Sequence, residues 1–176
     1  ERSATAIAAA LTGGATFAAL AQTGLRVLIA PRYPKRIPAL LRRARRLHVS
    51  ARTSRGSGVA RWIFLETMGE LAAAYALAPV AIVAGSFGRR GGQTLMEPAA
   101  HGCAIIHGPQ VAHVREEAEA LAHRGAQVVA DWSAAVTHAM HRLTTPGPDP
   151  RDALNDLRGA TARHLHHALS LLDQQR

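Results

Sequence analysis

The chain has 176 residues, of which 48% are hydrophobic, so it can bury the core of one domain and is too apolar for a disordered polypeptide. Lys and Arg number 21 against 12 Asp and Glu, and the net charge of +9 favours anionic partners such as nucleotides, phosphorylated lipids or nucleic acid. Two Trp, two Tyr and three Phe are too few for a surface that stacks single-stranded bases. No apolar run approaches the ~20 residues of a membrane span.

The only cysteine, Cys103, lies within an apolar run, so we expect a buried and unreactive thiol. A single cysteine excludes an internal disulfide framework and a cysteine zinc cluster, and it fits a reducing compartment. The sequence begins at Glu1 with no charged-then-apolar leader pattern, and we expect it to be a segment of a longer protein.

Short apolar runs alternate with segments of helical periodicity, and Gly or Pro marks most junctions. The apolar runs predict strands at residues 4–10, 26–30, 48–51, 62–65, 79–84, 103–106 and 126–130. The periodic segments predict helices at residues 15–22, 36–47, 69–76, 95–101, 111–123, 133–143 and 151–172. A turn is expected at 12–14, a polar loop at 52–60 and a proline-rich break at 144–150.

This regular alternation predicts a parallel sheet covered by helices on both faces. The crossovers are expected to be right-handed, and such sheets bind ligands at the carboxyl ends of their strands. We therefore predict one Rossmann-like α/β domain over residues 1–176, with its functional residues in the loops that follow the strands.

Two strand-to-helix junctions share the pattern T-x-x-E, formed by Thr67 with Glu70 and by Thr94 with Glu97. In a capping box the Thr oxygen accepts an amide N–H of the first turn and the Glu reaches back to the cap residue. A capped helix start at the carboxyl edge of a sheet attracts anions. One such pattern more often marks only a well-capped helix, and two at the same edge make this purely structural interpretation weaker.

A glycine-rich loop, GSFGRRGG at residues 85–92, lies between these two patterns. Glycines let backbone amides approach a phosphate closely, and Arg supplies paired donors. The loop lacks the lysine of a Walker loop and the spacing G-x-G-x-x-G. By itself the loop fits phosphate binding and an ordinary surface loop equally well.

Four motifs together resemble the nucleotide-binding half of the lipid A Kdo transferases. They are PRYPKR at 31–36, ETMGEL at 66–71, GSFGRRGGQTLMEPAAHG at 85–102 and HGP at 107–109. Those enzymes are inverting glycosyltransferases of the GT-B class that move 3-deoxy-D-manno-octulosonic acid (Kdo) from CMP-Kdo to a lipid A precursor. The resemblance extends from about residue 4 to the C-terminus, and it implies that the chain is the C-terminal, donor-binding domain of such an enzyme.

The resemblance implies a CMP-Kdo pocket built from these motifs. The implied donor-binding residues are Arg32, Tyr33, Met68, Gly69, Glu70, Ser86, Gly91, Gly92, Thr94 and Glu97. Residues of the first motif would border the cytidine, those of the second would line one side of the nucleotide, and those of the third would face the phosphate. Glu97 would accept the ribose hydroxyls, a role that competes with its service in a capping box.

Several positions depart from the family pattern. Gln93 and Thr94 stand where the family has His-Asn, Tyr33 stands where it usually has His, and His113 stands where an Asn is common. The Thr-Gly-Gly at 12–14 lacks the His and Glu of the family's loop after the first strand. The family's catalytic base belongs to an N-terminal acceptor domain, so the resemblance implies no catalytic residue in this chain and no activity of the chain alone.

The implied partners are CMP-Kdo, a lipid A precursor bound through the N-terminal domain, and the membrane surface at the cytoplasmic face of the bacterial inner membrane. The resemblance implies no cofactor, no metal ion and no nucleic acid. Two alternatives stay open, namely a GT-B donor domain for another nucleotide sugar and a non-catalytic basic module that binds nucleic acid or membrane.

Two further groups of side chains more often belong to solvated helix surfaces. The histidines are His138, His141, His164, His166 and His167, and they lack the acidic or cysteine partners of a metal site. The arginines, all between residues 36 and 46, are Arg36, Arg42, Arg43, Arg45 and Arg46. The functional alternative for these arginines is contact with anionic lipid headgroups.

Overall fold

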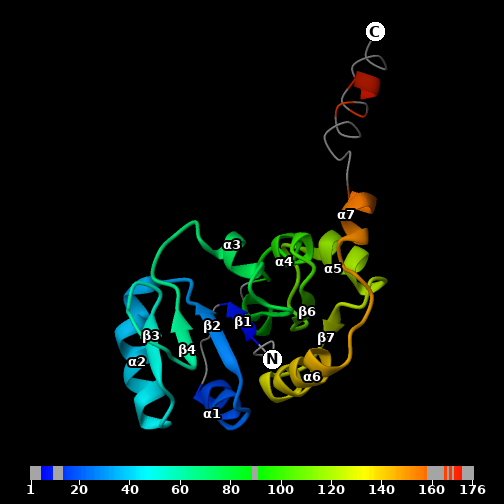
Figure 1. The fold of residues 1–176 in the computed structure, drawn as a ribbon. Helices are drawn as coiled ribbons and strands as arrows, with labels where there is room; N and C mark the ends of the chain where they lie inside the picture. Colours follow the sequence, from blue (N-terminus) through cyan, green and yellow to red (C-terminus); the bar gives the residue numbers. More distant parts are fainter. Residues whose placement is uncertain are drawn as a thin grey trace.

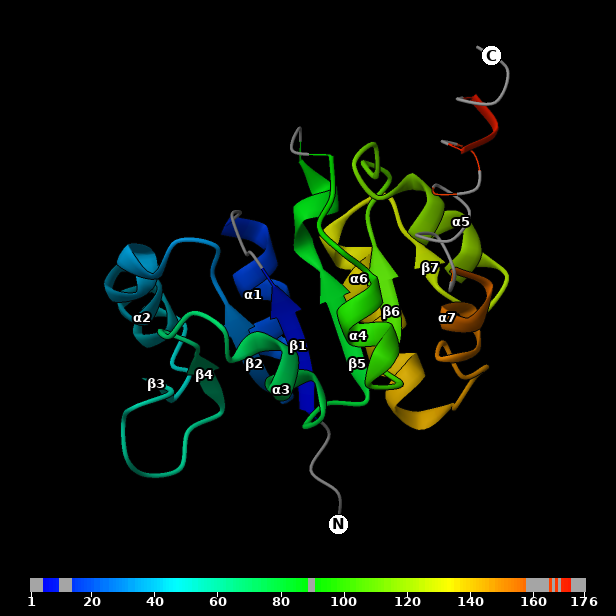
Figure 2. The ribbon, with the colours of Figure 1, turned by 90° about the horizontal axis from the view of Figure 1, so that it is seen from above.

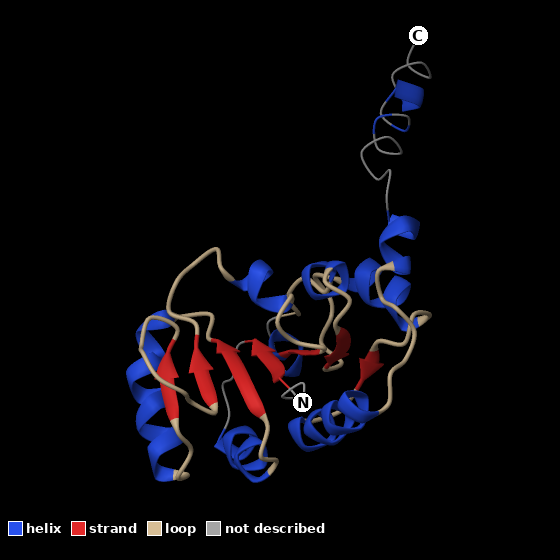
Figure 3. Ribbon diagram, in the orientation of Figure 1, coloured by secondary structure: helices blue, strands red, loops and turns tan. Residues whose placement is uncertain are grey.

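The computed structural model describes residues 5–9, 14–88, 91–157, 165, 167 and 169–171. Its seven described strands form one parallel sheet in the order β3-β4-β2-β1-β5-β6-β7 (Figure 3). The strands are β1 (Thr5–Ala9), β2 (Arg26–Ala30), β3 (Ala51–Thr53), β4 (Trp62–Phe64), β5 (Val80–Val83), β6 (Ala104–His107) and β7 (Gln127–Val128).

Helices cover both faces of this sheet (Figures 1 and 2). One face carries α1 (Gly14–Gln22), α2 (Ile37–Arg46) and α6 (Trp132–Thr144). The other face carries α3 (Leu71–Tyr75), α4 (Met96–Ala100), α5 (Arg115–Ala122) and α7 (Asp152–Leu157). Two short 3-10 turns, η1 (Pro34–Arg36) and η2 (Ala84–Phe87), follow β2 and β5. The predicted Rossmann-like fold class is confirmed.

Each face of the sheet has its own apolar core. On the face of α1 and α2, the Phe17 ring packs edge-on against Trp62, with centroids 5.3 Å apart and an interplanar angle of 73°. On the face of α3, Tyr75 and Cys103 are buried together with Leu28. The expected burial of Cys103 is confirmed, and burial raises the pKa of its thiol to about 11, which agrees with the expected low reactivity.

Strand β1 marks the point where the strand order reverses. It pairs with β2 on one side, Thr5 opposite Arg26, and with β5 on the other side, Ala6 opposite Val80. In parallel α/β sheets, ligands bind at the carboxyl edge beside such a reversal, because the loops diverge there and leave a crevice. The segments that follow β2, β4, β5 and β6 all leave the sheet at this edge, so the four sequence motifs share one end of the domain.

Most predicted strands are observed, and two are shifted or shortened. Residues 26–30 form β2 as predicted. The strand expected at 48–51 is wrong in its bounds, since His48 turns out of α2 with a φ of +54° and pairing with β4 starts only at Ala51. The last predicted strand, 126–130, pairs with β6 only through Gln127–Val128.

Several predicted helices begin later than the pattern indicates. The helix expected at 36–47 is observed as α2 and begins at Ile37, directly after η1 ends at Arg36. Both η1 and α2 have a proline within their first two residues. The helix expected at 111–123 begins at Arg115. The helix expected at 151–172 is observed as α7, which spans Asp152–Leu157, and most of residues 158–172 lie outside the described residues. Residues 12 and 13 of the turn predicted at 12–14 also lie outside them, and Gly14 is the first residue of α1.

Candidate functional site

The carboxyl edge of the sheet presents most of the predicted donor-binding residues to solvent. The exposed ones are Arg32, Tyr33, Met68, Gly69, Glu70, Thr94 and Glu97. Gly92 is half-buried, and Ser86 and Gly91 are buried. Met68 is the most prominent of the apolar ones, with 82% of its surface exposed.

The first T-x-x-E pattern forms a turn and not the predicted capping box. Gly69 adopts a φ of +87°, which interrupts the helical path, so α3 begins only at Leu71. Glu70 occupies the N-cap position with helical dihedral angles, and no side chain caps the helix. The Thr67 hydroxyl donates to the Glu70 carboxylate, and its oxygen accepts no amide N–H from the start of α3. The turn therefore projects Met68 and a carboxylate toward solvent at the end of β4.

Ser86 joins the loop after β5 to the loop after β6. Its hydroxyl donates to the Val83 carbonyl at 2.5 Å and accepts the Gly108 N–H at 2.7 Å, and the side chain is fully buried. The Gln110 N–H also donates to the Ser86 carbonyl at 3.0 Å. The geometry gives the Ser86 side chain the role of holding two loops together, on the inner side of the edge where a phosphate was expected.

Gly91 and Gly92 are required by both backbone conformation and packing. Their φ angles of +73° and +95° lie in the left-handed region, which favours glycine. A Cβ at Gly91 would lie 2.9 Å from the His113 ring, and one at Gly92 would lie 2.8 Å from a methyl group of Val114. The His113 N–H donates to the Gly91 carbonyl at 2.8 Å. The glycine loop is therefore held against the segment that leads from β6 into α5.

At the second T-x-x-E pattern, a carboxylate from another helix takes the capping role that was expected of Glu97. Glu117 of α5 accepts the Leu95 N–H at 2.6 Å and the Thr94 hydroxyl at 3.0 Å, at the start of α4. Thr94 in turn accepts the Met96 N–H at 3.3 Å. The predicted capping box is wrong, because a tertiary contact supplies the acceptor that Glu97 was expected to provide.

The exposed Glu97 side chain makes no hydrogen bond to the part of the chain that the structure describes. Its carboxylate lies near the buried Tyr75 hydroxyl, whose pKa is raised first by burial and then by this negative charge and by Cys103. The competition between a capping role and a ligand role, expected from the sequence, is therefore absent. Glu97 is available to accept hydrogen bonds from a ligand.

His107, the last residue of β6 and the first of the motif HGP, is a buried histidine to which the sequence analysis assigned no role. Its Nδ1 lies 2.8 Å from the Gly108 carbonyl, so Nδ1 carries the proton, and Nε2 is buried without a partner in the described chain. Burial lowers the pKa of His107, and the Gly108 bond opposes this effect. The neutral imidazole is the form that the fold favours.

The other histidines do not gather into a metal site in the described part of the chain, where no group of three or more His, Cys, Asp or Glu could hold an ion. His141 and His167 are exposed, and His164 and His166 lie outside the described residues. In the same described part, no helix combines the length and the apolar character that crossing a bilayer requires.

Comparison with known proteins gives one curated relative and two solved structures of interest, while no family model matches the chain. The chain is 34% identical over 154 residues to the 3-deoxy-D-manno-octulosonic acid transferase of Bordetella pertussis. This match covers 84% of the chain but only 36% of the relative, so the chain spans about a third of that protein's length. The resemblance to Kdo transferases inferred from the motifs is confirmed.

The structural comparisons agree with the predicted fold. The C-terminal CMP-Kdo binding domain of WaaA from Acinetobacter baumannii superposes with a TM-score of 0.75 at 21% identity, covering 89% of this chain and 90% of that domain. Sucrose-phosphate synthase from Thermosynechococcus elongatus superposes with a TM-score of 0.64 at 16% identity, covering 100% of this chain and 47% of that one. The chain has the α/β architecture of a GT-B glycosyltransferase domain.

The Glu117 contact predicts that Glu117 contributes more to the free energy of unfolding than its neighbour Glu116 does. Glu117→Ala removes the acceptor of the Leu95 amide and should lower the free energy of unfolding by about 2 kcal/mol, or the Tm by roughly 4–8 °C. Glu116→Ala, at an exposed position of the same helix, should change it by less than about 0.5 kcal/mol. Thermal unfolding of both variants measures this difference, and equal effects would show that Glu117 does not stabilise the start of α4.

Burial of His107 predicts a loss of stability on acidification. Its folded pKa lies below the unfolded value of about 6.5, so its contribution is complete above that pH and falls as the pH drops toward the folded pKa. Relative to His107→Leu, the wild-type chain should lose up to about 1.4 kcal/mol per pH unit in this window. The exposed His123→Gln serves as the control. Parallel stability curves for wild type and His107→Leu would contradict this account.

Proposed function

We propose that this chain is the C-terminal, CMP-Kdo-binding domain of a Kdo transferase of the GT-B class. In the proposed reaction the complete protein transfers Kdo to a lipid A precursor at the cytoplasmic face of the inner membrane. The acceptor and the catalytic base would belong to an N-terminal domain, so the 176-residue chain alone should bind donor without catalysis. Homology to a Kdo transferase over 84% of the chain supports this assignment.

The observation that carries the proposal is the convergence of four separated motifs on one edge of a parallel sheet. They follow β2, β4, β5 and β6, beside the strand at which the order reverses. Nucleotides bind at this edge in sheets of this type. A basic binding module would require no such convergence.

Different parts of the edge suit different parts of CMP-Kdo. The exposed Arg32 and Tyr33 are proposed to border the cytidine, and the turn that carries Met68 is proposed to line the nucleotide. Gly69 and Glu70 belong to the same turn. Glu97, a free carboxylate at the start of α4, is proposed to accept the two ribose hydroxyls in charge-assisted hydrogen bonds.

The phosphate is proposed to lie near Gly91, Gly92 and Thr94, with Ser86 fixing the loop from behind. The helices α3 and α4 have only five residues each, so their dipoles contribute less than the sequence analysis expected. Glu117 also places a negative charge at the Thr94 hydroxyl. Phosphate recognition is therefore proposed to depend on the main chain and the two arginines of the glycine-rich loop, residues 85–92, more than on a helix start.

The proposal predicts selective and Glu97-dependent binding of CMP. In calorimetric titrations of the 176-residue chain, CMP should bind more tightly than UDP or GDP. Glu97→Gln should weaken CMP binding by roughly 10- to 100-fold, because an amide replaces charge-assisted hydrogen bonds of about 1.5–3 kcal/mol each. The Tm should not change, since Glu97 caps no helix. Glu119→Gln, exposed on α5, is the matched control and should bind CMP normally.

Each other outcome has a distinct meaning. Absence of CMP binding would contradict the proposed function. Tighter binding of UDP or GDP would favour a donor domain for another nucleotide sugar. A lower Tm of Glu97→Gln with unchanged CMP affinity would remove Glu97 from the donor site and assign it to the fold.

A further inference from the structure

The positive charge of the chain is concentrated in its first part. Residues 2–65 contain twelve of the 21 Lys and Arg and no Asp or Glu, whereas the rest of the chain carries nine basic and all twelve acidic residues. Residues in this acid-free part form β1 to β4 together with α1 and α2. A charge asymmetry of this size indicates a face that meets an anionic partner.

Several of these basic residues have partners within the fold. Arg52 and Arg61 donate to main-chain carbonyls at distances of 2.6–3.4 Å. The Arg43 guanidinium lies 5.3 Å from the centroid of the Phe17 ring, and Arg55 forms an ion pair at 3.7 Å. These contacts account for their positions without any external ligand.

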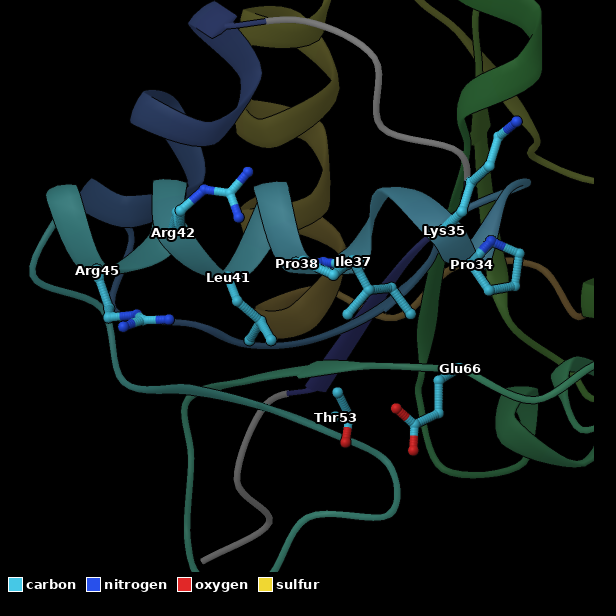
Figure 4. Close-up of a pocket in the computed structure, with 9 residues that line it drawn as sticks. All are labelled: Pro34, Lys35, Ile37, Pro38, Leu41, Arg42, Arg45, Thr53 and Glu66. Carbon is cyan, nitrogen blue, oxygen red and sulfur yellow. The ribbon is translucent and has the colours of Figure 1, made fainter.

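Lys35, Arg42 and Arg45 differ from these residues. All three are exposed, and none forms an ion pair or a side-chain hydrogen bond with the described part of the chain. All three are among the residues that line an open groove of about 500 Å³ between α2 and the segments that end β3 and β4. In Figure 4 the charged ends of Lys35 and Arg42 point away from Thr53 and Glu66 on the other side of this groove. Ile37 and Leu41 form an apolar wall along the helix side of this groove.

The opposite side of the groove does not neutralise these charges. Thr53 and Glu66 face α2 across the groove in Figure 4. Glu66 is the single carboxylate among the lining residues, and Arg55 lies 3.7 Å from it. The groove therefore keeps a positive charge beside an apolar wall. No aromatic side chain lines it, so it offers no platform for stacking bases.

We propose that this face of α2 and its groove dock on the anionic headgroups of a lipid membrane. Headgroup phosphates would pair with Lys35, Arg42 and Arg45, and of the two wall residues only the half-buried Leu41 would approach the less polar part of the lipid, since Ile37 is buried. Leu40 and Ala44 are packed in the core, so α2 cannot insert its apolar face as a free amphipathic helix does. Binding is therefore peripheral, electrostatic and sensitive to salt.

None of the ten residues proposed for the donor site lines this groove, although Lys35 and Glu66 belong to two of the same sequence motifs. The surface is inferred from charge and groove lining, and it does not depend on CMP binding. Failure of one assignment thus leaves the other intact, because CMP titration and membrane binding are measured separately.

Vesicle co-sedimentation of the 176-residue chain tests the proposal. Vesicles of equal parts phosphatidylglycerol and phosphatidylcholine should retain the chain at low salt, pure phosphatidylcholine should not, and high salt should release it. Arg42→Gln/Arg45→Gln should weaken retention by more than tenfold, at about fivefold for each charge removed. The matched control Arg115→Gln/Arg124→Gln removes the same charge from α5 and the turn that follows it, on the opposite face, and should retain most of the binding.

Three results would overturn the proposal. The first is the absence of retention on the anionic vesicles, and the second is equal weakening by the two double variants, which would show a response to net charge alone. The third is displacement from the vesicles by duplex DNA at lower concentration than by free anionic lipid, which would assign the surface to nucleic acid. Circular dichroism of each variant confirms that it is folded before the comparison is made.

Discussion

The functional edge of this domain depends on one buried hydroxyl that links two neighbouring loops. Ser86, after β5, accepts the N–H of Gly108, after β6, and the backbone of Ser86 occupies the space where a Cβ of residue 108 would lie. The two loops can approach this closely only because residue 108 is glycine. The contact fixes where the glycine-rich segment leaves the sheet, and Gly91 and Gly92 then pack against the entrance to α5. A buried inner layer thus supports an outer layer of exposed side chains at this edge.

Charge on this domain is divided between two regions with different chemistry. At the carboxyl edge, acidic side chains are either engaged, as Glu117 is at the start of α4, or free, as Glu97 is. Around α2 the free charges are basic and line a groove. A free carboxylate suits sugar hydroxyls, whereas unpaired guanidinium and ammonium groups suit phosphates of a surface. The proposed nucleotide site and the proposed docking surface therefore use different side chains of the same domain.

The sequence predicted the architecture better than the details of the junctions. Strands such as β5 were identifiable because a run of four apolar, mainly β-branched residues is typical of a buried strand. The helix starts were wrong because their causes are not local. Gly69 adopts a left-handed conformation that no periodicity encodes, and the acceptor at Leu95 comes from Glu117, which is 22 residues away. The run R-E-E-A-E at residues 115–119 is typical of a solvated helix surface, so no sequence signal separated Glu117 from its neighbours.

Whether the carboxyl edge binds the nucleotide is tested most directly by an NMR titration of the chain with CMP. The account predicts that the amides of Gly69, Gly91 and Gly92 shift first, because they belong to the loops after β4 and β5 at the crevice. Amides of α6, which lie on the face formed with α1, should stay unchanged. Shifts confined to α2 or to α6, with these three glycines unaffected, would contradict the assignment of the donor site.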